Sequence, residues 1–228
     1  MARMVRVARP DDLPAALVQL EVARPRAVLV VVGSAQRLVG ADLDAAQQLF
    51  EAVVVPLCEE LRVDVVDGGT DAGVMQAMGQ ARAAAGARFE LVGVVAGGTV
   101  AGNADEDPVQ FESNHTHFVI VPGSDWGDES PWITRVAAEL AGSSPVVGLL
   151  VGGGDIAVQD VGHLVDAGFP VFALDGSGSL ADLLAAGDPA DDADVEKLRG
   201  SALVRSVAGF ADPGRLRSVL RDALLPDD

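Results

Sequence analysis

The chain has 228 residues, 49% of them hydrophobic, and a formal charge of −18 from 34 acidic residues against 16 lysines and arginines. This length and hydrophobic content suffice for one large domain with its own core. The charge repels nucleic acid and anionic membranes, so we expect neither as a partner, and any phosphate must be held by backbone amides and helix N-termini.

The longest apolar runs, such as residues 27–32, are too short to span a bilayer, and the first residues show no signal-peptide core. We therefore predict a cytoplasmic protein. Its only cysteine, Cys58, lies among helical residues, so we predict a core residue and no intramolecular disulfide.

Strands and helices alternate along most of the chain. Residues 1–24 are interpreted as a short strand or helix that leads in, and residues 26–32 form an unbroken apolar strand of the kind that is covered on both faces. Apolar spacing predicts a helix at residues 42–61, which Pro56 should bend or break. Further strands are predicted at residues 63–66, 89–95, 114–121, 145–151 and 170–174, and further helices at residues 73–85, 132–141, 155–167 and 180–186.

The last forty residues change in character. An acidic linker at residues 187–194 precedes two predicted helices, at residues 195–207 and 213–225, which cover the ligand cleft, pack on one face of the sheet or form a dimer contact. Alternating strands and helices predict an α/β fold. We predict a three-layer sandwich with a mostly parallel sheet of about six or seven strands, formed by residues 1–186, with residues 187–228 packed on the same domain.

Glycine-rich turns follow four of the six predicted strands. The clearest is Asp67-Gly-Gly-Thr70, after which a helix begins at Gly73. Free amides and the helix dipole stabilise an anion at such a junction, and in a doubly wound sheet these turns share the C-terminal edge where ligands bind. No turn matches G-x-G-x-x-G or the P-loop, so NAD-linked oxidoreduction and ATP hydrolysis lose support.

Two histidines, His115 and His117, alternate along a predicted strand and should therefore share one face. Zinc would need further ligands, and His163 is the only other histidine, so we predict no metal site and a structural or ligand-contacting role. No partnered nucleophile is evident, and we predict no catalytic residues and no cofactor. The candidate ligand-binding residues are Gly33, Ser34, Gly68, Gly69, Thr70, Gly73, Val74, Met75, Asn114, His115, His117, Gly152, Gly153, Gly154, Asp175, Gly176, Ser177 and Gly178.

Four segments together resemble the SLOG superfamily, and within it the LSDAT branch. That branch includes the N-terminal cytosolic region of melastatin-type TRP channels and stand-alone prokaryotic proteins. The segments are residues 67–75 (DGGTDAGVM), 114–118 (NHTHF), 152–154 (GGG) and 170–184 (PVFALDGSGSLADLL). The resemblance implies a Rossmann-like domain that binds a nucleotide or a nucleotide-derived ligand such as ADP-ribose, NAD or a cyclic relative. A homodimer or homo-oligomer is left open.

A related group suggests the alternative function. Lonely Guy phosphoribohydrolases, which cleave an N-glycosidic bond, carry P-G-G-x-G-T-x-x-E, and the matching positions here are residues 151–159. The proline, the later glycine and the threonine are absent, and Gln159 stands at the glutamate position. Because an amide cannot act as a carboxylate base, we expect binding rather than catalysis. Asp160 is adjacent, and a shift in register would restore an acid.

Overall fold

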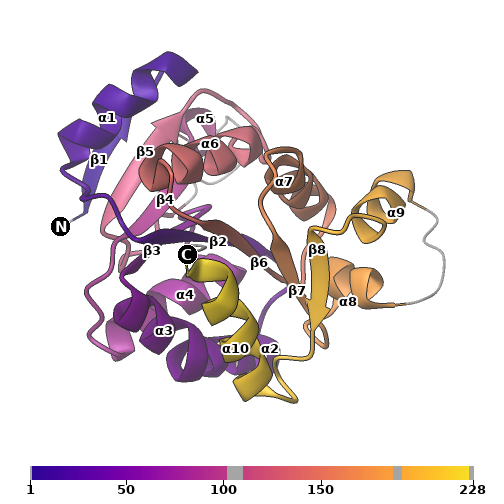
Figure 1. Ribbon diagram of the computed structural model, residues 1–228. Coiled ribbons are helices and arrows are strands. Elements are labelled where there is room, and N and C mark those ends of the chain that lie inside the picture. Colours follow the sequence, from indigo (N-terminus) through magenta and orange to yellow (C-terminus); the bar gives the residue numbers. More distant parts are fainter. Residues whose placement is uncertain (1, 102–109, 187–191, 226–228) are drawn as a thin grey trace.

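The computed structural model describes residues 2–101, 110–186 and 192–225. Within these residues, eight parallel strands form one sheet in the order β1-β5-β4-β3-β2-β6-β7-β8 (Figure 1). The strands are β1 (Arg3–Arg6), β2 (Ala27–Gly33), β3 (Val63–Asp67), β4 (Leu91–Ala96), β5 (His117–Val121), β6 (Val146–Val151), β7 (Val171–Leu174) and β8 (Val204–Val207).

Helices cover both faces of the sheet, which gives the predicted three layers (Figure 1). One face is covered by α1 (Leu13–Leu20), α6 (Ser130–Ala141), α7 (Asp155–Asp166), α8 (Ser179–Ala185) and α9 (Ala193–Arg199). The other face is covered by α2 (Ala41–Leu49), α3 (Val55–Leu61), α4 (Gly73–Ala84) and α10 (Pro213–Leu224). The short helix α5 (Gly97–Ala101) follows β4.

The central strand β2 shows why a strand in this fold is apolar throughout. Val28, Val30 and Val32 belong to the core cluster on the α6 face, whereas Leu29 and Val31 belong to the cluster on the α4 face. Successive side chains of a strand point to opposite faces, so a strand covered on both sides has no polar position.

The direction in which successive strands are added to the sheet reverses at β2. From β2 the sheet grows through β3, β4 and β5 on one side, and through β6, β7 and β8 on the other. The loops that follow β2 and β6 therefore leave toward opposite layers, which opens a crevice at the C-terminal ends of the strands.

Both edges of the sheet contain short strands. β1 pairs with β5, and β8 pairs with β7. The sequence left β1 as a strand or a helix and placed β8 inside a predicted helix at residues 195–207. The predicted helix is present only as far as Arg199, where α9 ends, and its second part was wrong, because the chain then turns into the sheet and forms β8.

The predicted long helix at residues 42–61 is present but irregular. A π-helical turn, Phe50–Val54, joins α2 to α3, and Pro56 lies in the first turn of α3. Proline has no amide hydrogen to donate, and the wider turn before it accommodates its ring without ending the helix. Cys58 is fully buried in this helix, and burial raises the pKa of its thiol.

Two boundaries near the middle of the chain differ from the prediction. The sequence predicts no helix between the strands at residues 89–95 and 114–121, and residues 100–113 read as a polar loop, but residues 97–101 form α5. The rest of the predicted loop lies partly outside the described residues. β5 begins only at His117, and Asn114 to Thr116 form the turn that precedes it. The prediction that His115 and His117 share one face of a strand was therefore wrong.

The C-terminal helix α10 packs on the α4 face. Its buried residues Leu216, Leu220 and Leu224 belong to the same core cluster as Phe50 of the π-helical turn. The predicted acidic linker lies mostly outside the described residues. No helix in the described ranges is long and apolar enough to cross a membrane.

Candidate functional site

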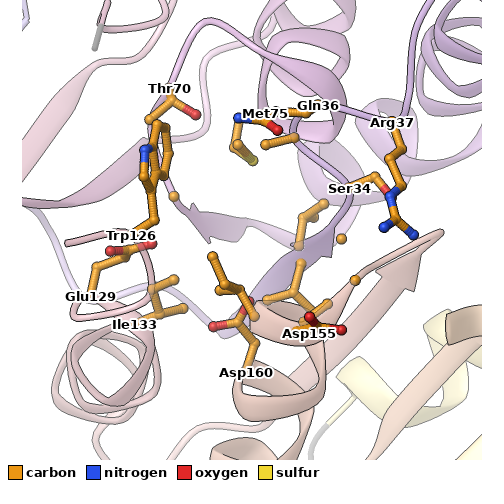
Figure 2. A pocket seen from close by; sticks show the side chains of 18 of the residues that line it. Ser34, Gln36, Arg37, Thr70, Met75, Trp126, Glu129, Ile133, Asp155 and Asp160 are labelled. Carbon is orange, nitrogen blue, oxygen red and sulfur yellow. The ribbon is translucent and has the colours of Figure 1, made fainter. Parts of the chain in front are cut away.

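A cavity of about 380 Å³ lies at the C-terminal edge of the sheet, beside the point where the chain direction changes (Figure 2). Its walls come from the ends of β2, β3 and β4, the loop after β5, and the starts of α6 and α7. The lining residues are Val31, Val32, Gly33, Ser34, Ala35, Gln36, Arg37, Gly68, Thr70, Met75, Val95, Thr99, Trp126, Glu129, Ile133, Gly154, Asp155, Ile156, Ala157 and Asp160.

About a third of the candidate residues line this cavity. They are Gly33, Ser34, Gly68, Thr70, Met75 and Gly154. The threonine is notable because it is 4% exposed and its Oγ1 has no hydrogen-bond partner among the described residues. A buried hydroxyl without a partner in a cavity wall is a group that a ligand can satisfy.

Gly152 and Gly153 do not line the cavity, and their amides already donate hydrogen bonds to side chains. The amide of Gly152 donates to Ser177 Oγ at 2.8 Å, and the amide of Gly153 donates to Ser34 Oγ at 2.7 Å. These bonds tie the end of β6 to the turns after β2 and β7. The two glycines therefore connect neighbouring turns and offer no free amide to an anion.

The turn after β3 is held in a similar way. Gly69 faces the sheet, where an added Cβ would lie 2.8 Å from Gly93 Cα. Gly73 has φ +50°, and its Cβ would lie 2.0 Å from the Ser34 carbonyl oxygen, which accepts the Val74 amide at 3.0 Å. Gly73 therefore lets the start of α4 contact the β2 turn directly.

His115 belongs to a buried ionic cluster that lies outside the cavity wall. Its Nε2 donates to Asp67 Oδ1 at 2.7 Å, and its Nδ1 donates to Glu112 Oε2 at 2.8 Å. Burial alone would lower the pKa of the imidazole, but the two carboxylates outweigh it and raise the pKa to about 9. Asp67 also accepts the Gly69 amide at 2.8 Å, so the charged histidine fixes the turn whose next residue, Thr70, reaches the cavity.

The other candidates after β5 and β7 are also placed elsewhere. Asn114 donates to Glu112, and His117 Nδ1 lies 3.3 Å from Glu90 Oε2 at the N-terminal end of the sheet. Asp175, Gly176 and Gly178 flank the β7 turn, where the Gly176 amide donates to Asp182 at 2.8 Å. None of these residues lines the cavity.

Several residues that line the cavity lie outside the glycine-rich turns and were not among the candidate ligand-binding residues. The most important are Arg37, Trp126, Glu129, Asp155 and Asp160. One signal was available for Asp160. It lies in an amphipathic helix at a position that faces the core together with Ala157, Val161 and Leu164. Burying a carboxyl group on the apolar face of a helix costs free energy unless the group is paired or hydrogen-bonded, so such a residue is a candidate for a functional role.

The start of α7 supplies free backbone amides. The first amide of this helix with a backbone acceptor is that of Val158, which donates to the carbonyl oxygen of Gly154 at 3.1 Å. Among the described residues, the preceding amides from Gly154 to Ala157 have no backbone or side-chain acceptor. Together with the helix dipole they attract an anion, and Arg37 lies on the same side of the cavity as Asp155 (Figure 2).

Trp126 lies in a cavity-lining loop whose backbone amides donate hydrogen bonds to carboxylates of the same loop. Asp128 accepts the amides of Ser124 at 2.9 Å and Asp125 at 3.1 Å, and these bonds lower its pKa. Glu129 accepts the Gly127 amide at 3.1 Å. The indole is 40% exposed and lies across the cavity from Arg37 (Figure 2), so it offers a flat surface to a ring.

Two carboxyl groups near Trp126 have unusual acidity. Burial raises the pKa of Asp160 to about 7, the charge of Glu129 adds to the shift, and the Ser130 hydroxyl opposes it. Burial also raises the pKa of Glu129. Asp160 is 7% exposed, and its Oδ1 has no hydrogen-bond partner among the described residues. Perturbed acids of this kind in a cavity mark a functional site.

A metal site is a separate question. Within residues 2–101, 110–186 and 192–225, no group of three or more histidine, cysteine, aspartate or glutamate side chains is arranged to hold a metal ion. In the cluster around His115, both ring nitrogens are occupied by carboxylates.

The fold and the cavity define a doubly wound α/β protein with a space of small-molecule size at its topological switch point. A family model described as "SLOG in TRPM, prokaryote" matches residues 26–212, and the chain belongs to this family. The predicted resemblance to the LSDAT branch is thereby confirmed. No protein with a curated description matches the chain.

Solved structures share the fold at low sequence identity. The X-ray structure of TM1055, a structural-genomics target, has a TM-score of 0.56 and 18% identity, over 86% of this chain and 99% of that one. The molybdenum cofactor binding protein from the phototrophic bacterium Rippkaea orientalis has a TM-score of 0.55 and 15% identity, over 87% of this chain and 99% of that one. At these identities the likeness shows the fold alone.

Proposed function

We propose that the chain binds a nucleotide or a nucleotide-derived ligand, such as ADP-ribose, NAD or a cyclic relative, in the cavity at the β2/β6 switch point. The observation that carries this proposal is the cavity itself. Its volume of about 380 Å³ falls in the usual range for small-molecule sites, and its walls are mostly apolar with a few polar groups. Membership of the SLOG family and a neighbour that binds the molybdenum cofactor support a ligand of this general kind.

The polar groups are divided between two ends of the cavity. One end has the free first-turn amides of α7 and Arg37, and the other end has Trp126 with Glu129 (Figure 2). A phosphorylated ligand fits this division because amides and a guanidinium bind phosphate while the indole stacks on a base. In this proposal the phosphate lies at α7, and not at the turn after β3 that the sequence analysis favoured or at the amides of Gly152 and Gly153.

The proposal is tested by titration calorimetry with ADP-ribose, NAD, AMP and ribose 5-phosphate. Arg37→Ala should weaken phosphorylated ligands by about 10- to 100-fold, because a hydrogen bond to a charged group contributes about 1.5–3 kcal/mol. Arg88→Ala is the matched control. It removes the same charge from an exposed position beside the N-terminal end of β4, far along the strand from the cavity.

Two results would count against this function. Failure of all four compounds to bind the folded protein would contradict nucleotide binding in the cavity. An equal loss of affinity in Arg37→Ala and Arg88→Ala would show that only the overall charge matters, not a phosphate contact at Arg37.

A second function is favoured by the register of α7. Gln159 is exposed, whereas Asp160, one residue later, is buried and lines the cavity. With a pKa of about 7, Asp160 can donate a proton near neutral pH. In hydrolysis of an N-glycosidic bond, water would bond to the anomeric carbon, the C–N bond would break, the base nitrogen would take the proton of Asp160, and Glu129 would take the proton of water.

Chromatography of AMP and NAD after incubation with the protein separates the two functions. Release of free base by the wild type and its absence in Asp160→Asn would establish the hydrolase. Binding without release in both proteins supports a binding module and contradicts the hydrolase.

A further inference from the structure

We propose that Glu129 and Asp160 recognise an exocyclic amine on the ring of the bound ligand. This inference rests on the proposed function, because it assumes that a nucleotide-type ligand occupies the cavity with its ring at the end opposite Arg37.

Both acids line the cavity, Glu129 next to Trp126 and Asp160 on the part of the wall between Ile133 and Asp155 (Figure 2). Glu129 comes from the residue before α6 and Asp160 from the middle of α7 (Figure 2). Asp160 is 7% exposed and one of its oxygens lacks a partner among the described residues. Among the described residues that line the cavity, Arg37 is the one basic residue, and it lies across the space from Glu129 (Figure 2).

An exocyclic amine placed between the two acids matches the hydrogen-bonding groups that they offer. An ionised carboxyl group offers acceptors alone, and a protonated one offers a single donor beside an acceptor. An oxo group in the same place would turn a lone pair toward the acid that is ionised, and a phosphate would add like charge. The exocyclic amine donates its N–H groups to the carboxyl oxygens, and the adjacent ring nitrogen accepts from the protonated acid, so this edge matches both states of the pair.

The spacing along α7 agrees with this orientation. Asp155, at the helix start where the free amides lie, and Asp160 are five residues apart, which is about 7.5 Å along the helix axis. That separation leaves room for a ribose between a phosphate at the α7 amides and a ring at Asp160.

The protonation of Asp160 also makes the recognition depend on pH. Glu129, the residue before α6, faces Asp160, and Asp155 and Arg37 are the other charged residues among the described residues that line the cavity. On α9, Lys197 pairs with Asp166 at 3.6 Å. Below pH 7 the neutral acid donates to a ring nitrogen, and above pH 7 this donor is lost. Adenine- and cytosine-type edges, which pair an amine with an acceptor nitrogen, should therefore bind more weakly as the pH rises.

The test uses matched nucleotides that differ only by amine and oxo groups. Calorimetry at pH 6 compares AMP with IMP and CMP with UMP, and ribose 5-phosphate serves as the base-free reference at each pH. We expect the amine member of at least one pair to bind about tenfold more tightly than its oxo partner. Equal affinities within both pairs, with ribose 5-phosphate still bound, would overturn this inference and leave the proposed function intact.

Two variants separate recognition from a structural role. Asp160→Asn keeps one donor and one acceptor at every pH, so it should retain the amine preference and lose its dependence on pH between 6 and 8. Asp160→Leu removes both groups, so it should lose the preference while ribose 5-phosphate binds as before. An amine preference that persists in Asp160→Leu would overturn the inference.

The wild-type comparison needs no variant, so the inference stays testable if the leucine protein does not fold. Absence of binding by all five compounds would contradict the proposed function and this inference together.

Discussion

A single buried histidine connects the interior to the cavity turn. The imidazolium of His115 lies between Asp67 and Glu112, and its side chain has no exposed surface. Without it, two carboxylates would remain buried with no cation between them. Breaking a buried pair in this way typically costs about 3–5 kcal/mol.

We therefore expect His115→Ala to lower the free energy of unfolding by about 3–5 kcal/mol at pH 6. Because the folded pKa of about 9 exceeds the unfolded value, the contribution of His115 is complete below the unfolded pKa of about 6.5 and is lost as the pH rises through 9. Urea unfolding at pH 6 and pH 9.5 measures it, with His163→Ala as the comparison. A difference from wild type that is equal at both pH values would contradict the charged cluster.

A glycine makes the contact between the β2 turn and α4. Gly73→Ala should lower the melting temperature by several degrees, because its Cβ would meet the Ser34 carbonyl oxygen and its φ of +50° disfavours a side chain. Gly162→Ala is the matched control, since its Cβ would have no heavy atom within 4 Å and it lies within α7, where alanine is favoured. A Gly73→Ala protein as stable as Gly162→Ala would refute the close approach.

At the scale of elements, α10 is tied to the main core although it follows the acidic linker. Leu216 is fully buried in the cluster that includes Phe50. Leu216→Ala should cost about 2–5 kcal/mol, whereas Leu225→Ala, at a position 45% exposed, should change little. Far-UV circular dichroism and tryptophan fluorescence should give one coincident transition in wild type. Separate transitions would make residues 192–225 an independent unit.

The elements that sequence predicted well are those that are buried on both faces. Residues 27–32 are apolar throughout, so the sequence alone predicted a strand covered on both faces. β8 was missed because its sequence, VRSV, is short and has exposed polar positions at an edge. The start of β5 was misplaced because His115 is buried by charge pairing rather than by strand packing, and no local pattern shows a partner 48 residues away.

The cavity was only partly predictable for a related reason. Glycine-rich turns such as the one at Gly68 indicate the C-terminal edge of the sheet, and the cavity lies at that edge. Which amides stay free depends on long-range partners, such as the Ser34 hydroxyl that occupies Gly153 across 119 residues. Trp126 and Glu129 come from a loop folded by local carboxylates, and nothing in the loop sequence shows that it lies above the strand ends.

At the scale of the whole molecule, we expect the net negative charge to determine how stability depends on salt. A net charge of −18 repels itself in the folded state more than in the expanded chain. The Debye length falls from about 30 Å at 0.01 M salt to about 8 Å at 0.15 M. We expect the melting temperature to rise over this range of NaCl, since exposed pairs such as Arg217 with Glu60 contribute little that salt could remove. A melting temperature that falls with salt would contradict dominance by self-repulsion.

The same field acts on ligands. Phosphorylated compounds approach against the net charge, so their association rate should increase with NaCl over the same range. Stopped-flow measurement of the Trp126 fluorescence change on mixing with ADP-ribose tests this. A rate that decreases with salt would indicate local attraction by Arg37 that exceeds the repulsion of the whole surface.

The short edge strands have a consequence for how copies of this chain meet in a crowded cell. The exposed positions of β1 include Arg3 and Arg6, and those of β8 include Arg205. An open strand edge is a template for adding another strand, and arginines at both ends set like charges against each other when two copies align edge to edge. We therefore expect like charge at Arg6 and Arg205 to oppose the addition of a second copy to either edge of the eight strands described.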